Sequence, residues 1–224
     1  MNAPTPVTIE IFSDVMCPWC VIGYKQLEQA LGTLEGEIEA EIRWQPFELN
    51  PHMPPEGEDA ASHIARKYGR APDPAMRGQM EAMAAQAGYD MRYLGEGEEP
   101  ESRLWNTFLA HKLLRWALEQ HGAEAQTRLK LALFDAHFQQ RRNLGNREVL
   151  LDVAQGAGLD REGAIAALED AALEEQVRQA EELAMEMDIT AVPTMLINRK
   201  YMIPGAQNPD TYVNLLRRVV ERGG

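Results

Sequence analysis

Residues 7–20 read VTIEIFSDVMCPWC, and this stretch decides the fold. Its first six residues are β-branched or apolar apart from Glu10, which predicts a strand buried on both faces. After the cysteines, apolar residues recur at spacings of three and four up to Leu34, so an amphipathic helix should begin at the cysteines themselves. A second strand is predicted within residues 41–49, with Pro46 near its end or at a sheet edge, because proline cannot donate to a ladder. The chain therefore opens as β-α-β.

The composition changes between residues 59 and 172, where Ala, Leu, Met, Glu, Gln and Arg recur with helical periodicity. Strand-like sequence returns at residues 194–197 and 201–203, and the short turn between them predicts a hairpin. A cap signal at Asn208, followed by proline, predicts a final helix. The fold class is therefore α/β, with the order β-α-β, many helices, β-β-α. The expected domains are an α/β domain at residues 1–57 and 173–224 and an inserted, all-helical domain at residues 58–172.

The balance of charge argues against nucleic-acid binding. The 224 residues carry 35 acidic and 22 basic side chains, a formal charge of −13, whereas phosphate binding requires positive charge. The first residues lack the basic flank and apolar run of a secretory signal, and no apolar run approaches the roughly 20 residues that cross a bilayer. We therefore expect a cytoplasmic protein without a nucleic-acid or membrane partner.

The two cysteines of the chain form a CxxC motif, Cys17-Pro18-Trp19-Cys20. A helix that begins at Pro18 places Cys17 at its N-cap, where free N-H groups and the helix dipole stabilise a thiolate. Cys20 lies one turn further on the same face, so it can resolve a mixed disulfide on Cys17. Pro18 suits the first helical position, and Trp19 could place an apolar surface beside the reactive sulfur. The motif predicts a thiol-disulfide oxidoreductase with Cys17 as nucleophile.

Three other interpretations of the cysteines compete with redox chemistry. A structural zinc site normally needs four Cys or His ligands, but the chain has no second CxxC and its five histidines are scattered. A structural disulfide closing so short a loop would contribute only about 2 kcal/mol and would tend to be reduced in a cytosol. Two inert buried cysteines remain an alternative, although the strand, loop, CxxC and helix context favours redox chemistry.

Four segments together carry a resemblance to a known family. They are SDVMCPWC at residues 13–20, FELNP at 47–51, AVPT at 191–194 and GAQ at 205–207. In this order, and with the long helical stretch between them, they resemble the FrnE-like branch of the DsbA family over nearly the whole chain. The resemblance implies a thioredoxin-like fold with a helical insertion. It also implies a protein-disulfide oxidoreductase that exchanges disulfides without a bound prosthetic group or metal.

The resemblance also assigns roles to individual residues. Cys17 matches the attacking cysteine and Cys20 the resolving one, and together they would form the redox-active disulfide. Pro193 matches the proline whose cis peptide bond faces the CxxC and aligns the substrate backbone. The expected substrate contacts are Trp19, Val192, Pro193 and Thr194.

Two rival functions remain open beside disulfide exchange in a thiol- or disulfide-containing protein or small molecule. The same architecture resembles the glutathione-dependent 2-hydroxychromene-2-carboxylate isomerases and kappa-class glutathione transferases. Those enzymes commonly carry serine where this chain has Cys17, although glutathione could still act as a co-substrate. A non-enzymatic, chaperone-like binding module that uses the helical insertion is the third hypothesis.

Glu10 and His111 are candidates for supporting roles. Glu10 lies in an otherwise apolar strand, and a buried carboxylate with a raised pKa could accept or pass the proton of the resolving thiol. The alternative is that Glu10 faces an exposed edge or pairs with a base. For His111, on the apolar face of a predicted helix, burial with a hydrogen bond to backbone is favoured over catalysis.

Two further patterns are assigned structural roles. Core packing is favoured over an adaptable binding surface for four methionines. The segment 169–186 is predicted to be a solvated helix face, because Glu174 and Arg178 have i,i+4 spacing. The four methionines are Met76, Met80, Met83 and Met91.

Overall fold

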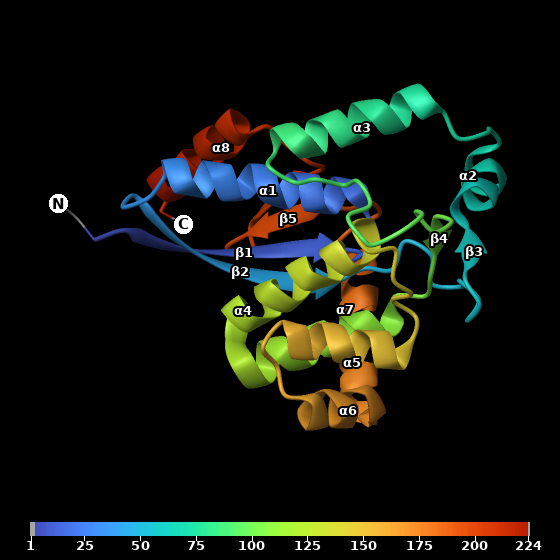
Figure 1. The fold of residues 1–224 in the computed structure, drawn as a ribbon. Coiled ribbons are helices and arrows are strands. Elements are labelled where there is room, and N and C mark those ends of the chain that lie inside the picture. The colour runs from blue at the N-terminus through green and yellow to red at the C-terminus, as the bar shows by residue number, and fades with distance from the viewer. Residues whose placement is uncertain (1–2, 224) are drawn as a thin grey trace.

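A four-stranded mixed sheet forms the centre of the computed structural model, which describes residues 3–223 (Figure 1). Strand β1 (Thr5–Ser13) pairs in parallel with β2 (Ile38–Pro46), and helix α1 (Pro18–Thr33) connects them. The hairpin of β5 (Thr194–Ile197) and β6 (Tyr201–Pro204) adds to the other side of β1, so the strand order is β2-β1-β5-β6. The β-α-β opening and the closing hairpin are therefore confirmed.

The two faces of the sheet bury different sets of side chains, because successive residues of a strand point to opposite faces. Ile9 and Ile11 of β1 share a buried cluster with α1 and with α8 (Pro209–Glu221). Phe12 points the other way and packs with Leu196 and with Ala184 of α7 (Ala171–Glu186). Central strand β1 is thus covered on both faces, as its sequence predicts.

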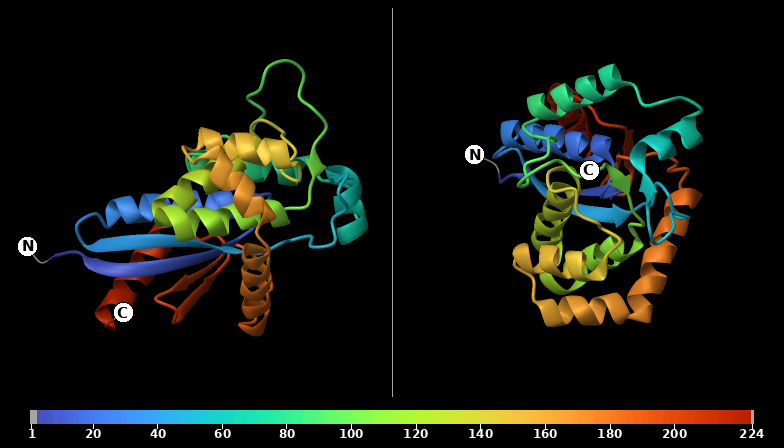
Figure 2. Two further views of the ribbon diagram at one scale, coloured as in Figure 1. Left: turned by 90° about the horizontal axis from the view of Figure 1, so that it is seen from below. Right: turned by 45° about the vertical axis from the view of Figure 1, so that its right-hand side comes forward.

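The helical block of α4 (Phe108–Phe138), α5 (Arg147–Gly156) and α6 (Arg161–Glu169) has a buried cluster of its own. It lies on the β2 side of the strands, opposite α1, α3 and α8 in Figure 1 and in the right-hand view of Figure 2. Gln126 of α4 joins the block to the sheet edge: its side chain accepts from Trp44 N and donates to Trp44 O, both at 2.8 Å. The free backbone groups of edge strand β2 are thereby paired at Trp44.

The segment between β2 and α4 departs from the all-helical prediction. Besides α2 (Ala60–Tyr68) and α3 (Pro74–Gln86), it contains a short antiparallel pair, β3 (Glu58–Asp59) with β4 (Arg103–Leu104). Strands of two residues are too short to show a hydrophobic period, so the pattern of apolar residues could not predict them. The expectation that residues 58–172 are all helical is wrong at this pair.

Element boundaries differ from the predictions by a few residues. Strand β2 begins at Ile38 and ends at Pro46, which confirms the proline at the end of an edge strand. The final helix begins at Pro209, capped by Asn208, whose side chain accepts from Thr211 N at 2.8 Å. The expected boundary between residues 172 and 173 falls just inside α7. No helix among residues 3–223 combines the length and apolarity that crossing a membrane requires.

The four methionines do not share one role. Met91 is 5% exposed and belongs to the main core, and Met80 packs partly against that core. Met76 and Met83 of α3 are 49% and 38% exposed, so core packing is wrong for these two. The predicted ion pair between Glu174 and Arg178 is confirmed at 3.2 Å on an exposed face of α7.

Candidate active site

The CxxC motif lies at the start of α1, as predicted. Cys17 is the N-cap residue, with φ −84° and ψ 115°, and Pro18 is the first helical residue. The side chains of Cys17 and Cys20 approach to 3.2 Å, and both thiols are free. Cys20 is fully buried and Cys17 is 3% exposed, whereas Trp19 between them is 42% exposed. Trp19 therefore presents an accessible apolar surface directly beside the two sulfurs.

A loop from the other half of the chain lies against Cys17. The Val192-Pro193 peptide bond is cis, and Cys17 Sγ donates to the Val192 carbonyl at 3.7 Å. The Pro193 carbonyl accepts from Gly205 N at 2.8 Å, which ties the loop to the end of the hairpin. Thr194 is buried, and its hydroxyl donates to the Ala191 carbonyl at 2.8 Å, so its side chain supports the loop from within.

Gly23 permits the close approach between α1 and this loop. A Cβ atom at Gly23 would lie 3.0 Å from Pro193 Cγ and 3.2 Å from Ala206 Cβ. These separations are shorter than ordinary van der Waals contact, so any larger residue must displace the loop or the helix. The absence of a side chain at Gly23 therefore helps to set how closely Pro193 approaches α1.

The substitution Gly23→Ala is expected to lower both the free energy of unfolding, by about 1–3 kcal/mol, and disulfide exchange activity, because the Pro193 loop must move. Gly32→Ala in the same helix is the matched control, since a Cβ there would meet no described atom within 4 Å. That control should gain up to about 1 kcal/mol from helix propensity. Urea unfolding and an insulin reduction assay measure both quantities, and equal behaviour of the two variants would contradict the proposed contact.

Two buried charged groups lie beside the cysteines. Asp14 accepts from Leu49 N at 2.7 Å through Oδ2 and from Met16 N at 3.2 Å through Oδ1. Lys130 of α4 is fully buried and donates to the Ser13 carbonyl at 3.2 Å. Neither residue was singled out from the sequence. The part of the site that sequence reasoning missed is therefore its charge, supplied by the loop before the CxxC and by the helical block.

The two thiols titrate as a coupled pair. The hydrogen bond that Cys17 shares with Cys20, followed by burial, raises the pKa of Cys17. Burial opposes ionisation of Cys20, but the hydrogen bond from Cys17 and the positive charge of Lys130 outweigh it, so the pKa of Cys20 is lowered. The pair thus favours a single thiolate, because the hydrogen bond from one sulfur stabilises the negative charge of the other. Beyond that hydrogen bond, Lys130 contributes a positive charge that the helix dipole argument did not include.

Glu10 and His111 have structural partners. Glu10 points to the sheet face opposite Ile9 and Ile11, which pack with the cysteines. Its carboxylate accepts from Gln45 Nε2 at 2.9 Å and lies 3.5 Å from the Arg199 guanidinium, so pairing with a base is the interpretation that fits.

His111 is buried and hydrogen-bonded to the Phe47 backbone, as predicted. Burial, followed by the charge of Lys130, holds the pKa of His111 well below its usual range. Its Nε2 has no hydrogen-bond partner among residues 3–223. The ring is therefore a neutral core group.

A pair of carboxyl groups, Glu48 and Glu181, lies on the other side of Asp14. Glu181 accepts from Glu48 N at 3.0 Å, and Glu48 accepts from Asn106 Nδ2 at 3.4 Å. Burial, reinforced by the negative charges of Glu181 and Asp14, raises the pKa of Glu48 to about 8. Burial also raises the pKa of Glu181. The pair therefore holds a proton at neutral pH.

The substitution Glu48→Gln is expected to stabilise the fold increasingly as pH rises. The folded-state pKa of Glu48 lies above its unfolded value of 4.5, so its contribution to stability is fully present below that value and is lost as pH rises through about 8. Glutamine cannot ionise and avoids this loss. Melting temperatures of both proteins between about pH 5 and about pH 9 measure the difference, with exposed Glu182→Gln as control. A constant difference across that range would contradict the raised pKa of Glu48.

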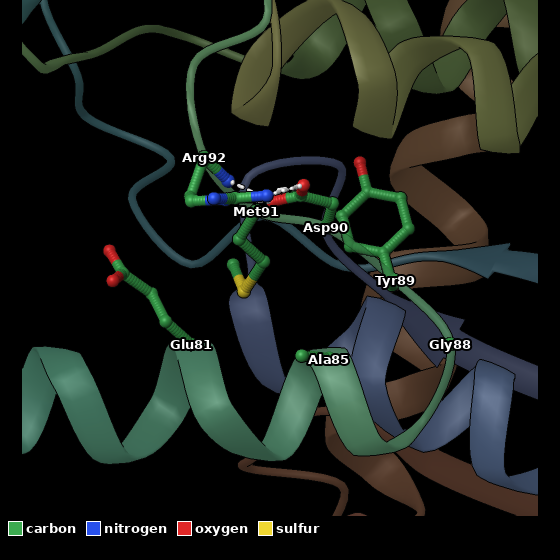
Figure 3. Close-up of a pocket in the computed structure, with 7 residues that line it drawn as sticks. All are labelled: Glu81, Ala85, Gly88, Tyr89, Asp90, Met91 and Arg92. Atoms are coloured by element: carbon green, nitrogen blue, oxygen red, sulfur yellow. Dashed lines mark hydrogen bonds and ion pairs between the residues drawn. The ribbon is translucent and has the colours of Figure 1, made fainter.

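A cavity of about 370 Å³ lies between the end of α3 and the loop that follows it (Figure 3). Its lining includes Tyr89, Met91 and Arg92 but neither cysteine nor Pro193. Arg92 is paired with Asp90 at 2.7 Å, and Glu81 on the opposite wall is paired with Arg77 at 2.8 Å. The charged side chains Arg92, Asp90 and Glu81 of the cavity are thus all paired.

Comparison with known proteins identifies the family. The profile of the DSBA-like thioredoxin domain matches residues 8–217. The chain belongs to this family. It is 32% identical to the Bacillus subtilis protein YwbO over 208 residues, covering 92% of this chain and 94% of that one. The fold is accordingly a thioredoxin-like DsbA fold with a helical insertion.

Two solved structures resemble the chain in fold. A probable DsbA oxidoreductase from Streptomyces coelicolor is 29% identical, with a TM-score of 0.84 over 97% of this chain and 92% of that one. The cytosolic disulfide reductase DsbM of Pseudomonas aeruginosa, solved with GSH, is 17% identical, with a TM-score of 0.65 over 96% and 99% of the two chains. The second likeness shows the fold alone. Membership of the DsbA-like family supports a thiol-disulfide oxidoreductase activity in general.

Proposed function

We propose that this protein catalyses disulfide exchange through Cys17 and Cys20, with Cys17 attacking and Cys20 resolving. The observation that carries the proposal is the meeting of two free thiols at the start of α1 with the Val192 carbonyl beside Pro193. Cys17 is the sulfur that contacts this loop, and Cys20 lies deeper. Trp19, Val192 and Pro193 are the proposed substrate contacts, which leaves Thr194 to support the loop.

The exchange proceeds in two balanced steps. The shared proton passes from Cys17 to Cys20, and the Cys17 thiolate attacks a substrate disulfide, forming a mixed disulfide and expelling one substrate thiolate. Cys20 then loses its proton and attacks the Cys17 sulfur, which releases the second substrate thiolate. The substrate gains two electrons and, with solvent, two protons, while Cys17 and Cys20 become a disulfide. The reverse sequence oxidises a dithiol.

Glutathione is the proposed co-substrate that resets the pair. Two molecules of glutathione would reduce the Cys17–Cys20 disulfide and leave as glutathione disulfide, so the balance needs no bound cofactor. The fold shared with the DsbM structure solved with GSH supports this choice. We propose that the reaction takes place in the cytoplasm. The proposed substrate is a protein or small molecule that carries a disulfide or a thiol. The FrnE-like branch is the proposed position within the family.

Insulin reduction with dithiothreitol as electron donor tests the proposal, alongside titration of the wild-type thiols against glutathione buffers. The wild type should accelerate insulin precipitation and show one reversible two-electron transition, and Cys17→Ser/Cys20→Ser should show neither. No reversible dithiol in the wild type, together with turnover of a glutathione conjugate, would instead indicate the isomerase or transferase hypothesis. Suppression of insulin aggregation by wild type and double variant alike would indicate a binding module.

A further inference from the structure

Lys130 is a buried lysine supplied to the redox site by the helical block. It lies in α4, fully buried, with its ammonium 5.1 Å from the ring centroid of Trp44 and 5.0 Å from that of Phe134. Its hydrogen bond goes to a neutral group, the Ser13 carbonyl, at 3.2 Å. Trp44 and Phe134 belong to the same buried cluster as Cys17 and Cys20. The ammonium is therefore enclosed by the core that surrounds the cysteines.

A buried ammonium requires compensation by negative charge, because removing it from water is costly. The charged and titratable groups that its field reaches are Asp14 in the loop before α1, Cys17 and Cys20 in α1, and His111 in its own helix. His111 is a neutral core group, so it supplies no negative charge. Ser13, whose carbonyl accepts from Lys130, is the last residue of β1 and directly precedes Asp14. The negative partners are therefore Asp14 and the thiolate of the cysteine pair.

We propose that Lys130 of the helical block is a positioning residue for the thiolate: its buried ammonium stabilises the reduced, singly ionised cysteine pair, and buried Asp14 opposes it. The inference rests on the proposed disulfide exchange and extends it. It makes the inserted helical block a contributor to the reduction potential, because α4 fixes the charge that Cys17 and Cys20 experience. Lys130 and Asp14 then set the potential in opposite directions.

Lys130→Met tests the proposal, because methionine keeps an unbranched side chain of similar length and removes the charge. The thiolate at neutral pH should fall about tenfold, and the equilibrium constant against glutathione should shift about tenfold, or about 30 mV, toward a more reducing pair. Asp14→Asn should move both quantities in the opposite direction. Thiolate absorbance against pH and titration in glutathione buffers measure them.

Lys112→Met is the matched control. Lys112 is also a buried lysine of α4, 2% exposed, and it also donates to a backbone carbonyl, that of Leu168 at 2.9 Å. Its loss should lower the melting temperature without changing the thiol pKa or the potential. The expected result is that the thiol pKa and the potential shift in opposite directions in Lys130→Met and Asp14→Asn and do not shift in Lys112→Met. General destabilisation of the fold cannot produce this pattern.

Two outcomes would separate failure of the inference from failure of the proposed function. A wild type with a reversible dithiol, but with unchanged thiol pKa and potential in folded Lys130→Met, would overturn the role of Lys130 alone. Equal shifts in Lys112→Met and Lys130→Met would also overturn it. A wild type with no reversible dithiol would remove the proposed function itself, whatever the variants show.

Discussion

Replacing Cys17 with serine is expected to reduce the insulin reduction rate to that of the buffer alone. The serine oxygen cannot form a disulfide, and buried Cys20, which is fully enclosed, cannot reach a substrate in its place. The substitution changes one atom at the N-cap, so the fold should remain intact, because serine is itself a favourable N-cap residue. Steady-state rates and a thermal unfolding curve of the same preparation measure the two effects.

Cys20→Ser should instead arrest the protein on its substrate. Cys17 can still attack, but without a resolving thiol the mixed disulfide accumulates. Mass spectrometry should find one substrate molecule bound per chain, released by excess dithiothreitol. Adduct formation on Cys20 in the Cys17→Ser variant would reverse the assigned order of the two cysteines. Full turnover by Cys20→Ser would contradict the role of Cys20 as the resolving thiol.

The second large effect is expected for Phe134→Ala, which should lower the free energy of unfolding by about 3–5 kcal/mol. Phe134 is fully buried in α4 and packs edge-on against Trp44 of β2, with ring centroids 6.1 Å apart. Its loss leaves a cavity between the helical block and the sheet that rigid neighbours cannot fill. Chemical denaturation followed by tryptophan fluorescence measures the change.

Phe108→Ala is the control within the same helix. Phe108 is only partly buried and lies under the Arg178 guanidinium, 4.3 Å from the ring centroid. Truncation of Phe108 should lower the free energy of unfolding by clearly less than truncation of Phe134, because part of the Phe108 ring is already exposed to water. Equal losses of unfolding free energy for the two phenylalanines would contradict the view that Phe134 fills the space between α4 and the sheet.

Local signals were sufficient to predict the redox motif and its setting. The apolar run before the CxxC and the helical spacing after it fix β1, α1 and the N-cap position of Cys17 from neighbouring residues alone. Pro193 had no such signal: it meets Cys17 only through the fold, and its assignment came from family resemblance. Cys17 and Val192 are 175 residues apart along the chain. The pairing of β1 with β5 brings the loop that contains Val192 to the motif.

The charges at the site could not be predicted in this way. Lys130 is one of several charged residues on its helix, and nothing in the neighbouring sequence indicates that its ammonium is buried. Its carbonyl partner, Ser13, lies 117 residues earlier. Glu10 was the natural candidate for a buried acid at the site because it interrupts an apolar strand. It is buried, but strand alternation turns it to the sheet face opposite the one that packs with the cysteines. Asp14, in a loop, carries the negative charge instead.

The two hydrogen bonds between Gln126 and Trp44 also affect the tendency of the protein to aggregate in concentrated solution. An open sheet edge can pair with the edge of another molecule and begin aggregation. Gln126 occupies the donor and acceptor of Trp44 that a foreign strand would use. The opposite edge, β6, is four residues long and ends in Pro204. The Gln126 side chain of the inserted helices thus protects the β2 edge of the sheet from pairing with another molecule. The β6 edge is protected because the strand is short.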